Sequence, residues 1–235
     1  MTEPVLYIAG DVHHDGSDQG FCRWLDGLAK RSPARLVLLG DVVEWWVDGA
    51  TCAQRHGPVL TRMLALRRAG WQVDVVRGNR ELGAGRAFEI ACGGRLAWPR
   101  LDITLGGTRL RIVHGDRLIR DPGYHAWSAL SRSFPFRVLL QLMPEVIQDG
   151  IAAYLRRTSR GNRPPSQMRR ICMDPRRVRA AARGADVLIA GHIHESWRRR
   201  IGGADLILAG HWPWGHGHWV EVYADGRLER CSASV

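Results

Sequence analysis

Five short blocks of Asp, Asn and His residues each come directly after a run of apolar residues. The blocks are Asp11-Val12-His13, Gly40-Asp41, Gly78-Asn79-Arg80, His114-Gly115-Asp116 and Gly191-His192-Ile193-His194. Carboxylates, amide oxygens and imidazoles are the side chains that bind divalent metal ions. Two Asp, one Asn and four His exceed what one ion needs, so the set indicates two ions that share a ligand.

The seven expected ligands divide around one shared carboxylate. Asp41 is alone in its block, and a carboxylate has two oxygens with which it can bridge two ions. The first ion is expected to bind Asp11, His13 and His194. The second ion is expected to bind Asn79, His114 and His192. Each block taken alone is weak evidence, because Gly-Asp is common in turns and a lone His usually has a structural role.

The apolar runs before the blocks predict the elements that position them. Short runs rich in Val, Ile and Leu are typical of buried strands in an α/β sheet. The runs are Val5–Ala9, Leu36–Leu39, Val73–Val76, Leu110–Val113 and Val187–Ala190. Ligands of such sheets gather outside the carboxyl ends of the strands, so the five blocks are expected to meet at one place.

The remaining chain predicts helices and two hairpins. Helical spacing of apolar residues appears at 19–31 and 57–69, and these segments are expected to be crossover helices. Hairpins are expected around Gly106-Gly107 and Asp225-Gly226. More than seventy residues separate His114 from Val187, and they are expected to form a helical insertion. Its helices are predicted at about 124–133, 135–143 and 144–158.

The middle of the insertion is unusually apolar, and two interpretations stay open. Its apolar residues are Phe134, Phe136, Val138, Leu139, Leu140, Leu142, Met143, Val146, Ile147 and Ile151. They could pack a helical hairpin onto the main core. Alternatively, they could line an acyl-binding groove beside the metal ions, or lie in a membrane interface with basic residues around them.

The motif order resembles a known family. Asp-x-His, Gly-Asp, Gly-Asn, His-Gly-Asp and Gly-His-x-His, over about residues 5 to 223, resemble the calcineurin-like metallophosphoesterases. Within that superfamily the sequence is most similar to the UDP-2,3-diacylglucosamine diphosphatases. The features shared with these enzymes are Gly40-Asp41-Val42-Val43-Glu44 with Trp46, Gly78-Asn79-Arg80, His114-Gly115-Asp116 with Asp121 and Tyr124, and Ser159.

The resemblance implies a fold and a reaction. The fold would be an α/β, four-layer αββα metallophosphoesterase sandwich with a helical lid insertion at about 122–175, all within one domain, 1–235. The reaction would be metal-dependent hydrolysis of UDP-2,3-diacylglucosamine to UMP and 2,3-diacylglucosamine 1-phosphate in lipid A biosynthesis, with two Mn²⁺ ions. Asn79 and Arg80 would be catalytic. Substrate would be bound by Asn79, Arg80, Asp121, Tyr124, Ser159, Arg163 and His192.

The sequence departs from the diphosphatase pattern at three places. Glu81 stands where Asp is usual, which lengthens a carboxylate beside the metal ligands by one methylene. The stretch between His114-Gly115-Asp116 and Asp121 is one residue shorter. Gly161-Asn162-Arg163-Pro164-Pro165 replaces a polar segment that contains lysine. These departures concern substrate specificity and leave the expected metal ligands intact.

Charge and composition restrict the partners. The chain has 34 Lys+Arg and 23 Asp+Glu, a net charge of +11, which favours anionic partners. No aromatic residue accompanies the arginines between 156 and 183, so an anionic membrane surface is favoured over nucleic acid. No secretory signal or membrane span is evident, and the five cysteines are scattered. A cytoplasmic monomer, peripheral on the inner membrane, is expected.

Two other functions and two histidine segments remain to be weighed. The scaffold could act on another phosphodiester, a dinucleotide polyphosphate or a phosphoprotein, or could serve as a binding module without activity. A module of that kind is disfavoured because all seven ligands are present. Gly215-His216-Gly217-His218 is expected to be a C-terminal loop outside the site. His211 could line the site, and His14 is expected to point away from it.

Overall fold

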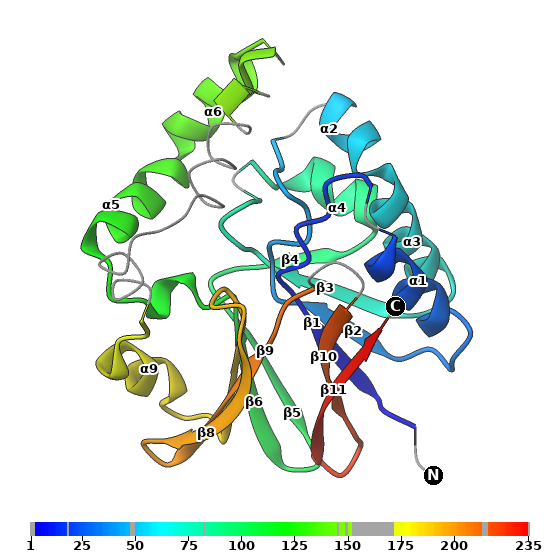
Figure 1. The fold of residues 1–235 in the computed structure, drawn as a ribbon, viewed down its shortest axis with the longest axis vertical. Coiled ribbons are helices and arrows are strands. Elements are labelled where there is room, and N and C mark those ends of the chain that lie inside the picture. Colours follow the sequence, from blue (N-terminus) through cyan, green and yellow to red (C-terminus); the bar gives the residue numbers. More distant parts are fainter. Residues whose placement is uncertain are drawn as a thin grey trace.

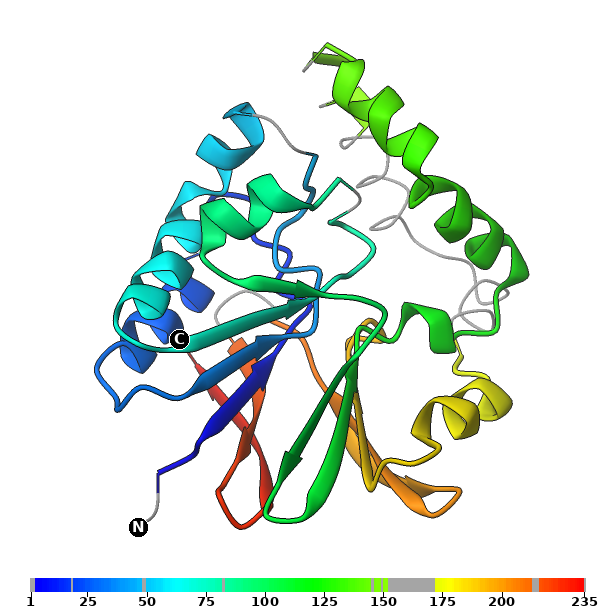
Figure 2. The ribbon, with the colours of Figure 1, turned by 180° about the vertical axis from the view of Figure 1, so that it is seen from behind.

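Two β-sheets pack face to face in the computed structural model, which describes residues 3–17, 19–47, 50–81, 83–144, 146–148, 150–151, 172–212 and 216–234. Helices cover the outer face of each sheet (Figures 1 and 2). The layers run helix, sheet, sheet, helix. This order confirms the expected four-layer αββα sandwich.

The first sheet has six strands in the order β11, β10, β1, β2, β3, β4. Four of them run parallel: β1 (Leu6–Ala9), β2 (Arg35–Leu38), β3 (Gln72–Val76) and β4 (Arg95–Ala97). The antiparallel hairpin of β10 (His216–Val222) and β11 (Leu228–Ser234) completes the other edge.

The second sheet has five strands in the order β5, β6, β7, β9, β8. Its parallel centre consists of β6 (Thr108–Val113), β7 (Val187–Ala190) and β9 (Ala204–Ala209). Antiparallel strands form its edges, namely β5 (Leu101–Leu105) and β8 (Ser196–Ile201). In both sheets, the carboxyl ends of the parallel strands therefore lie outside the hydrophobic core.

The apolar runs of β1, β2 and β7 are buried on both faces because each of these strands separates two cores. In β1, Tyr7 and Ala9 face the helices, whereas Leu6 and Ile8 face the second sheet. The outer helices of the first sheet are α1 (Gly20–Leu28), α2 (Ala50–Arg55), α3 (Gly57–Arg68) and α4 (Arg86–Cys92). The second sheet is covered by the 3₁₀ helix η1 (Asp116–Leu118) and by α9 (Pro175–Ala182). Strands buried in this way have no polar face, as the sequence predicted.

The insertion begins with two capped helices, α5 (Pro122–Ser131) and α6 (Phe134–Leu142). The Asp121 carboxylate accepts a hydrogen bond from the Tyr124 backbone N–H at the start of α5, and Ser133 caps α6 in the same way. A proline follows each cap, where its missing N–H has no cost. Figures 1 and 2 show the pair at one flank of the molecule. Most of the third expected helix lies outside the described residues.

The structure corrects two expectations about elements. The five blocks do not follow strands of one sheet, because β1, β2 and β3 belong to the first sheet and β6 and β7 to the second. The expected loop at His216 begins strand β10, which pairs with β11 from His216 opposite Ser234. Gly217 permits this strand because a Cβ there would collide with the Trp212 ring. That the chain is a single domain stays a prediction.

Within the part of the chain that the structure describes, no helix has both the length and the apolar character needed to cross a membrane.

Candidate metal centre

Five of the seven expected metal ligands have a left-handed backbone. The φ angles are 51° for Asp11, 50° for His13, 49° for Asp41, 68° for His192 and 62° for His194. Among the described residues, no other non-glycine residue has a positive φ. This conformation costs about 1–3 kcal/mol for a residue with a side chain and is concentrated at functional sites in proteins. The strain marks the blocks as a site independently of their residue types.

The glycines of the blocks let the ligand-bearing loops approach one another closely, both within each sheet and between the two sheets. Gly115 has a φ of +113°, and a Cβ there would lie 2.7 Å from the Gly191 carbonyl oxygen. A Cβ at Gly78 would contact the Asp41 carboxylate, and one at Gly191 would contact the Asp11 carboxylate. Replacing these glycines would therefore push the ligand-bearing loops apart.

The first ligand group consists of Asp11, His13 and His194. Their ligand atoms lie within 4.8 Å of one another. The Nε2 atoms of the two histidines are 3.1 Å apart, and the His194 Nε2 lies 3.8 Å from Asp11 Oδ1. Nitrogen and oxygen atoms that converge from β1 and from the loop after β7 are arranged as ligands of one ion.

The second ligand group contains His114, His192 and Asn79. The ligand atoms of Asp41, His114 and His192 lie within 4.8 Å of one another. The His114 Nδ1 lies 2.7 Å from the Leu39 carbonyl oxygen, to which only a protonated nitrogen can bond. The His114 Nε2 lies 2.9 Å from Asn79 Oδ1 and must lose any proton to bind a metal ion. This arrangement orients both atoms as ligands of a second ion.

Asp41 lies between the two groups, as its expected bridging role requires. Its Oδ2 is 4.0 Å from the His13 Nε2, and its Oδ1 is 3.6 Å from the His114 Nε2. The Arg80 backbone N–H donates to Asp41 Oδ1 at 2.8 Å and holds the carboxylate in this orientation. The geometry supports the partition of the seven residues that the sequence suggested, and their binding of metal stays a proposal.

A buried oxygen in the first group has no hydrogen-bond partner among the described residues. Asp11 Oδ2 accepts the His192 backbone N–H at 2.5 Å, but Asp11 Oδ1 has no donor within reach. Buried carboxylate oxygens are nearly always paired, so this atom is suited to a cation. Because the neighbouring donors are imidazole nitrogens and a carboxylate, the residues present fit a divalent metal ion.

The charges of the site also favour a cation. Burial raises the pKa of Asp11 to about 8, and the nearby Asp41 contributes to this rise. Burial opposes protonation of His114, but the carboxylates of Asp41 and Asp116 raise its pKa to about 9. Burial and His194 lower the pKa of His13 well below its usual value, which keeps that ring neutral and able to bind metal.

Glu81 joins the loop that carries Asp41 to the loop that carries Asn79. Its buried carboxylate accepts backbone N–H groups from Asp41 at 2.9 Å, Val42 at 2.8 Å and Gly78 at 3.0 Å. Both oxygens are used, and the longer side chain reaches the loop after β2 as well as its own. The departure from the usual Asp therefore affects loop geometry, in a way the sequence could not specify.

Arg80 lies beside the metal centre with its guanidinium between two carboxylates. The Arg80 Nε is 3.9 Å from Asp41 Oδ2, and its Nη1 is 4.0 Å from Glu44 Oε1. The side chain is 12% exposed, so its charge is weakly screened by water. Its expected role as a cation near a phosphoryl group stays a prediction.

The other expected substrate residues have different environments. Tyr124 donates its hydroxyl to Asp116 Oδ2 at 3.1 Å, and its ring lies 5.7 Å from the ring of His192. Asp121 caps α5, which explains its presence without a substrate. Ser159 and Arg163 lie outside the described residues. As substrate contacts, all four stay predictions.

The remaining histidines are placed by the structure. His14 is buried and packs against Cys22 and His56, which confirms that it points away from the ligands. The His211 ring is nearly parallel to the His194 ring, with the ring centres 5.0 Å apart. The His218 ring stacks on the His211 ring, with the ring centres 6.2 Å apart. Sequence reasoning left the contact between His194 and His211 undecided.

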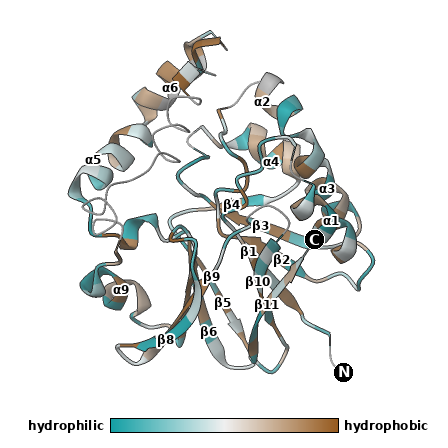
Figure 3. Cartoon of the chain, viewed as in Figure 1, coloured by the Kyte–Doolittle hydropathy of each residue, from teal (hydrophilic) through white to brown (hydrophobic). Residues whose placement is uncertain are grey.

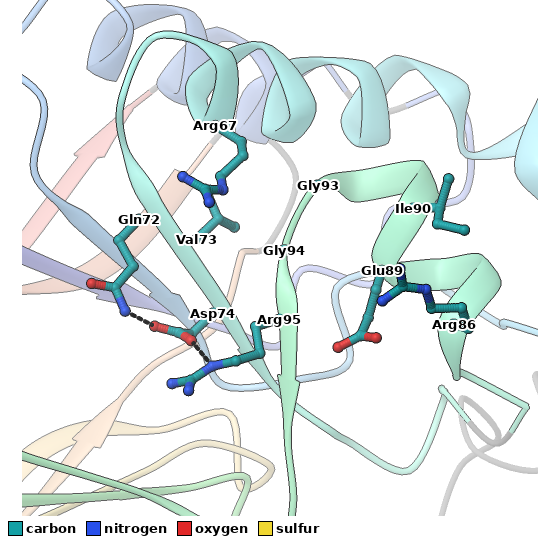
Figure 4. A pocket seen from close by; sticks show the side chains of 10 residues that line it. All are labelled: Arg67, Gln72, Val73, Asp74, Arg86, Glu89, Ile90, Gly93, Gly94 and Arg95. Atoms are coloured by element: carbon teal, nitrogen blue, oxygen red, sulfur yellow. Dashed lines mark hydrogen bonds and ion pairs between the residues drawn. The ribbon is translucent and has the colours of Figure 1, made fainter.

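A separate hollow of about 620 Å³ lies at the edge of the first sheet (Figure 4). Asp74 and Glu89 line it together with Arg67, Arg86 and Arg95. The Asp74 carboxylate accepts from Arg95 at 2.9 Å, and Glu89 accepts from the backbone N–H of the residue after Arg95. Charges of both signs share the wall, so these side chains do not indicate one class of ligand.

Comparison with known protein families matches residues 5–215 to the calcineurin-like phosphoesterases. The match covers every ligand-bearing block, from Asp11 to His194. The chain belongs to the calcineurin-like phosphoesterase family. It is therefore a hydrolase with a scaffold that binds divalent metal ions, and the two groups described above are its candidate sites.

Among relatives of this calcineurin-like phosphoesterase are proteins named UDP-2,3-diacylglucosamine hydrolase. The one from Pseudomonas putida strain W619 is 30% identical over 197 residues, which cover 81% of this chain and 82% of the relative. The one from Klebsiella pneumoniae is also 30% identical and covers 81% of each chain. Among solved structures, the Escherichia coli phosphoesterase Yfce is 18% identical over 98% of both chains, with a TM-score of 0.47.

Proposed function

We propose that the protein hydrolyses the pyrophosphate bond of UDP-2,3-diacylglucosamine and releases UMP and 2,3-diacylglucosamine 1-phosphate in lipid A biosynthesis. The names of the relatives support this substrate. The observation that carries the proposal is an exposed apolar surface on α5 and α6, joined to the loops of the metal centre. A small soluble phosphodiester has no use for such a surface, whereas two acyl chains do.

The two faces of α6 have different surroundings, which separates the two interpretations of its apolar residues. Leu140 is 2% exposed and packs on Trp45 and Val47, with Phe136 and Met143 beside it. This face holds the insertion against the loop that follows Asp41. The packing interpretation is therefore correct for these residues.

Other apolar side chains of the insertion are open to solvent. Its exposed apolar side chains are Trp127, Leu130, Phe134, Leu139, Leu142, Val146 and Ile147. Figure 3 shows α6 as one of the more hydrophobic helices. Leu142 is 77% exposed and Val146 is 83% exposed, which is unusual for side chains of this size. In our proposal, the acyl chains of the substrate cover this surface.

The residues around the metal centre would bind and orient the diphosphate. Two bound divalent ions, Mn²⁺ in our proposal, supply Lewis acidity and activate water for attack in line with the leaving group. The Arg80 guanidinium would stabilise negative charge on the phosphoryl oxygens during attack. Asn79 and His192 would orient the same group, and Tyr124 would contact the sugar phosphate. Water adds to phosphorus as the bridging P–O bond breaks.

Turnover of candidate substrates tests the proposal. The purified protein with Mn²⁺ is expected to release UMP from UDP-2,3-diacylglucosamine faster than it cleaves bis(p-nitrophenyl) phosphate, a diadenosine polyphosphate or a phosphopeptide. The Asp41→Asn variant is the matched control for contaminating activity. Preference for any of the other three compounds would overturn the lipid substrate and favour a different phosphoesterase.

The same proposal includes a location. An enzyme that acts on this substrate would work as a monomer at the cytoplasmic face of the inner membrane, with no nucleic-acid partner. The net charge of +11 and the exposed arginines of α9 and β8 support contact with anionic lipid. The open apolar side of α5 and α6 would face the same lipid, from which the substrate must enter.

A further inference from the structure

Arg132 is a buried cation at the base of the insertion that sequence reasoning did not single out. It ends α5, and its side chain is 9% exposed. The Arg132 Nη2 donates to Asp116 Oδ2 at 2.8 Å and to the Gly78 carbonyl oxygen at 3.4 Å. Its guanidinium carbon lies 4.8 Å from the centre of the Trp98 ring, which forms one wall of its site.

The two acceptors of Arg132 belong to the loops of the second ligand group. Gly78 precedes Asn79 at the end of β3, and Asp116 follows His114 by two residues at the end of β6. These strands lie in different sheets. One guanidinium from α5 therefore joins the insertion to both loops and the loops to each other.

Asp116 needs this cation. It is 2% exposed and accepts hydrogen bonds from the Tyr124 hydroxyl and from Arg132. Removal of Arg132 would leave this buried carboxylate beside His114 with the Tyr124 hydroxyl as its one side-chain donor among the described residues.

We propose that Arg132 is a positioning residue for the second ion: through Gly78 and Asp116 it fixes the loops of Asn79 and His114 and seats α5 over them. The inference rests on the proposed metal-binding role of these residues and not on the lipid substrate. Residues that orient metal ligands from outside are worth roughly 10- to 100-fold in metal affinity. The expected effect is confined to the second group, because Arg132 has no described contact with Asp11, His13 or His194.

Metal binding in single-ion backgrounds gives a direct test. Mn²⁺ affinity is measured by calorimetry on metal-free full-length protein carrying His194→Ala, which leaves the second group, or His192→Ala, which leaves the first. Arg132→Ala, Arg132→Lys and Arg117→Ala are added to each. Arg117 is the matched control, because it is exposed and lies over the same Trp98 ring at 5.7 Å.

The expected pattern is selective. Arg132→Ala should weaken Mn²⁺ binding roughly 10- to 100-fold in the His194→Ala background and leave it unchanged in the His192→Ala background. Arg132→Lys should recover part of the loss, since an ammonium group can pair with Asp116 but has no flat face to stack over the Trp98 ring. Arg117→Ala should change neither. Hydrogen exchange of 122–131 should accelerate in Arg132→Ala alone.

Equal weakening in both backgrounds, or unchanged affinity in both, would overturn the proposal. If Arg132→Ala does not fold, Arg132→Lys decides, and a lysine variant with no selective loss counts against a positioning role. Because the readout contains no lipid, failure to hydrolyse UDP-2,3-diacylglucosamine would leave this test valid. The two proposals can therefore fail separately.

Discussion

Asp41 is the residue that we expect both ligand groups to share, since its two oxygens face His13 and His114. Asp41→Asn should lower the bound metal per chain and abolish turnover, because a neutral amide bridges two cations poorly. Metal content by mass spectrometry and UMP release check this. Asp26→Asn, which changes an exposed aspartate, is the control. Two bound ions with normal turnover in Asp41→Asn would show that the carboxylate does not bridge.

Glu81 offers a prediction about stability. Glu81→Asp should lower the free energy of unfolding by about 1–3 kcal/mol, because the shorter carboxylate cannot reach all three backbone N–H groups and leaves at least one unpaired. Chemical denaturation of the metal-free protein measures this. Glu89→Asp is the control, since that carboxylate accepts from one backbone N–H. A stability equal to the parent would mean that the loops re-form around aspartate without loss.

The residues of the candidate site differ in how far the sequence could reveal them. The seven expected ligands could be found because each follows an apolar run in a short motif. Arg132 could not, because it ends a helix with no motif around it and its acceptors are 16 and 54 positions away. Glu81 was noticed, but its role depends on a contact between two loops that spacing does not encode.

At the scale of elements, α6 has one face that packs and one that is open. Leu139→Gln with Leu142→Gln should raise the KM for UDP-2,3-diacylglucosamine and barely change cleavage of bis(p-nitrophenyl) phosphate. Each buried methylene of an acyl chain contributes about 0.8 kcal/mol, so loss of part of this apolar surface should raise the KM more than about tenfold. Initial-rate kinetics on the two substrates measure the ratio.

Leu140→Ala is the matched control for the open face. Leu140 is buried against Trp45 and Val47, so its truncation should lower the unfolding temperature and affect both substrates. Equal losses on the two substrates in the Leu139 and Leu142 variant would contradict acyl binding. The lipid proposal would then lose its structural support.

The strands show which parts of the fold can be predicted from the sequence. Runs such as Val187–Ala190 predicted strands to within one or two residues, because burial on both faces of a strand favours a short segment rich in apolar residues. The division into two sheets was not evident from the residues, since each run is equally apolar whichever sheet it joins. Strand β10 was missed at His216 because its backbone pairing with β11 does not depend on apolar side chains.

At the scale of the molecule, the chain combines a net charge of +11 with exposed apolar side chains on its insertion. The protein should sediment with vesicles of phosphatidylglycerol and not with phosphatidylcholine alone, because anionic headgroups attract the basic surface. Binding should weaken as salt rises, since the interaction is screened within about 10 Å at 0.1 M. Arg176→Ala with Arg177→Ala, both exposed on α9, should reduce sedimentation. Equal binding to both lipids would contradict an electrostatic contribution.

The left-handed backbone of five expected ligands sets a conflict between stability and activity. Each such residue costs about 1–3 kcal/mol that glycine would not, so the metal-free fold would gain from losing the side chains that bind metal. Asp and His in this conformation therefore lower the stability of the metal-free fold while supplying the side chains that the proposed metal centre needs.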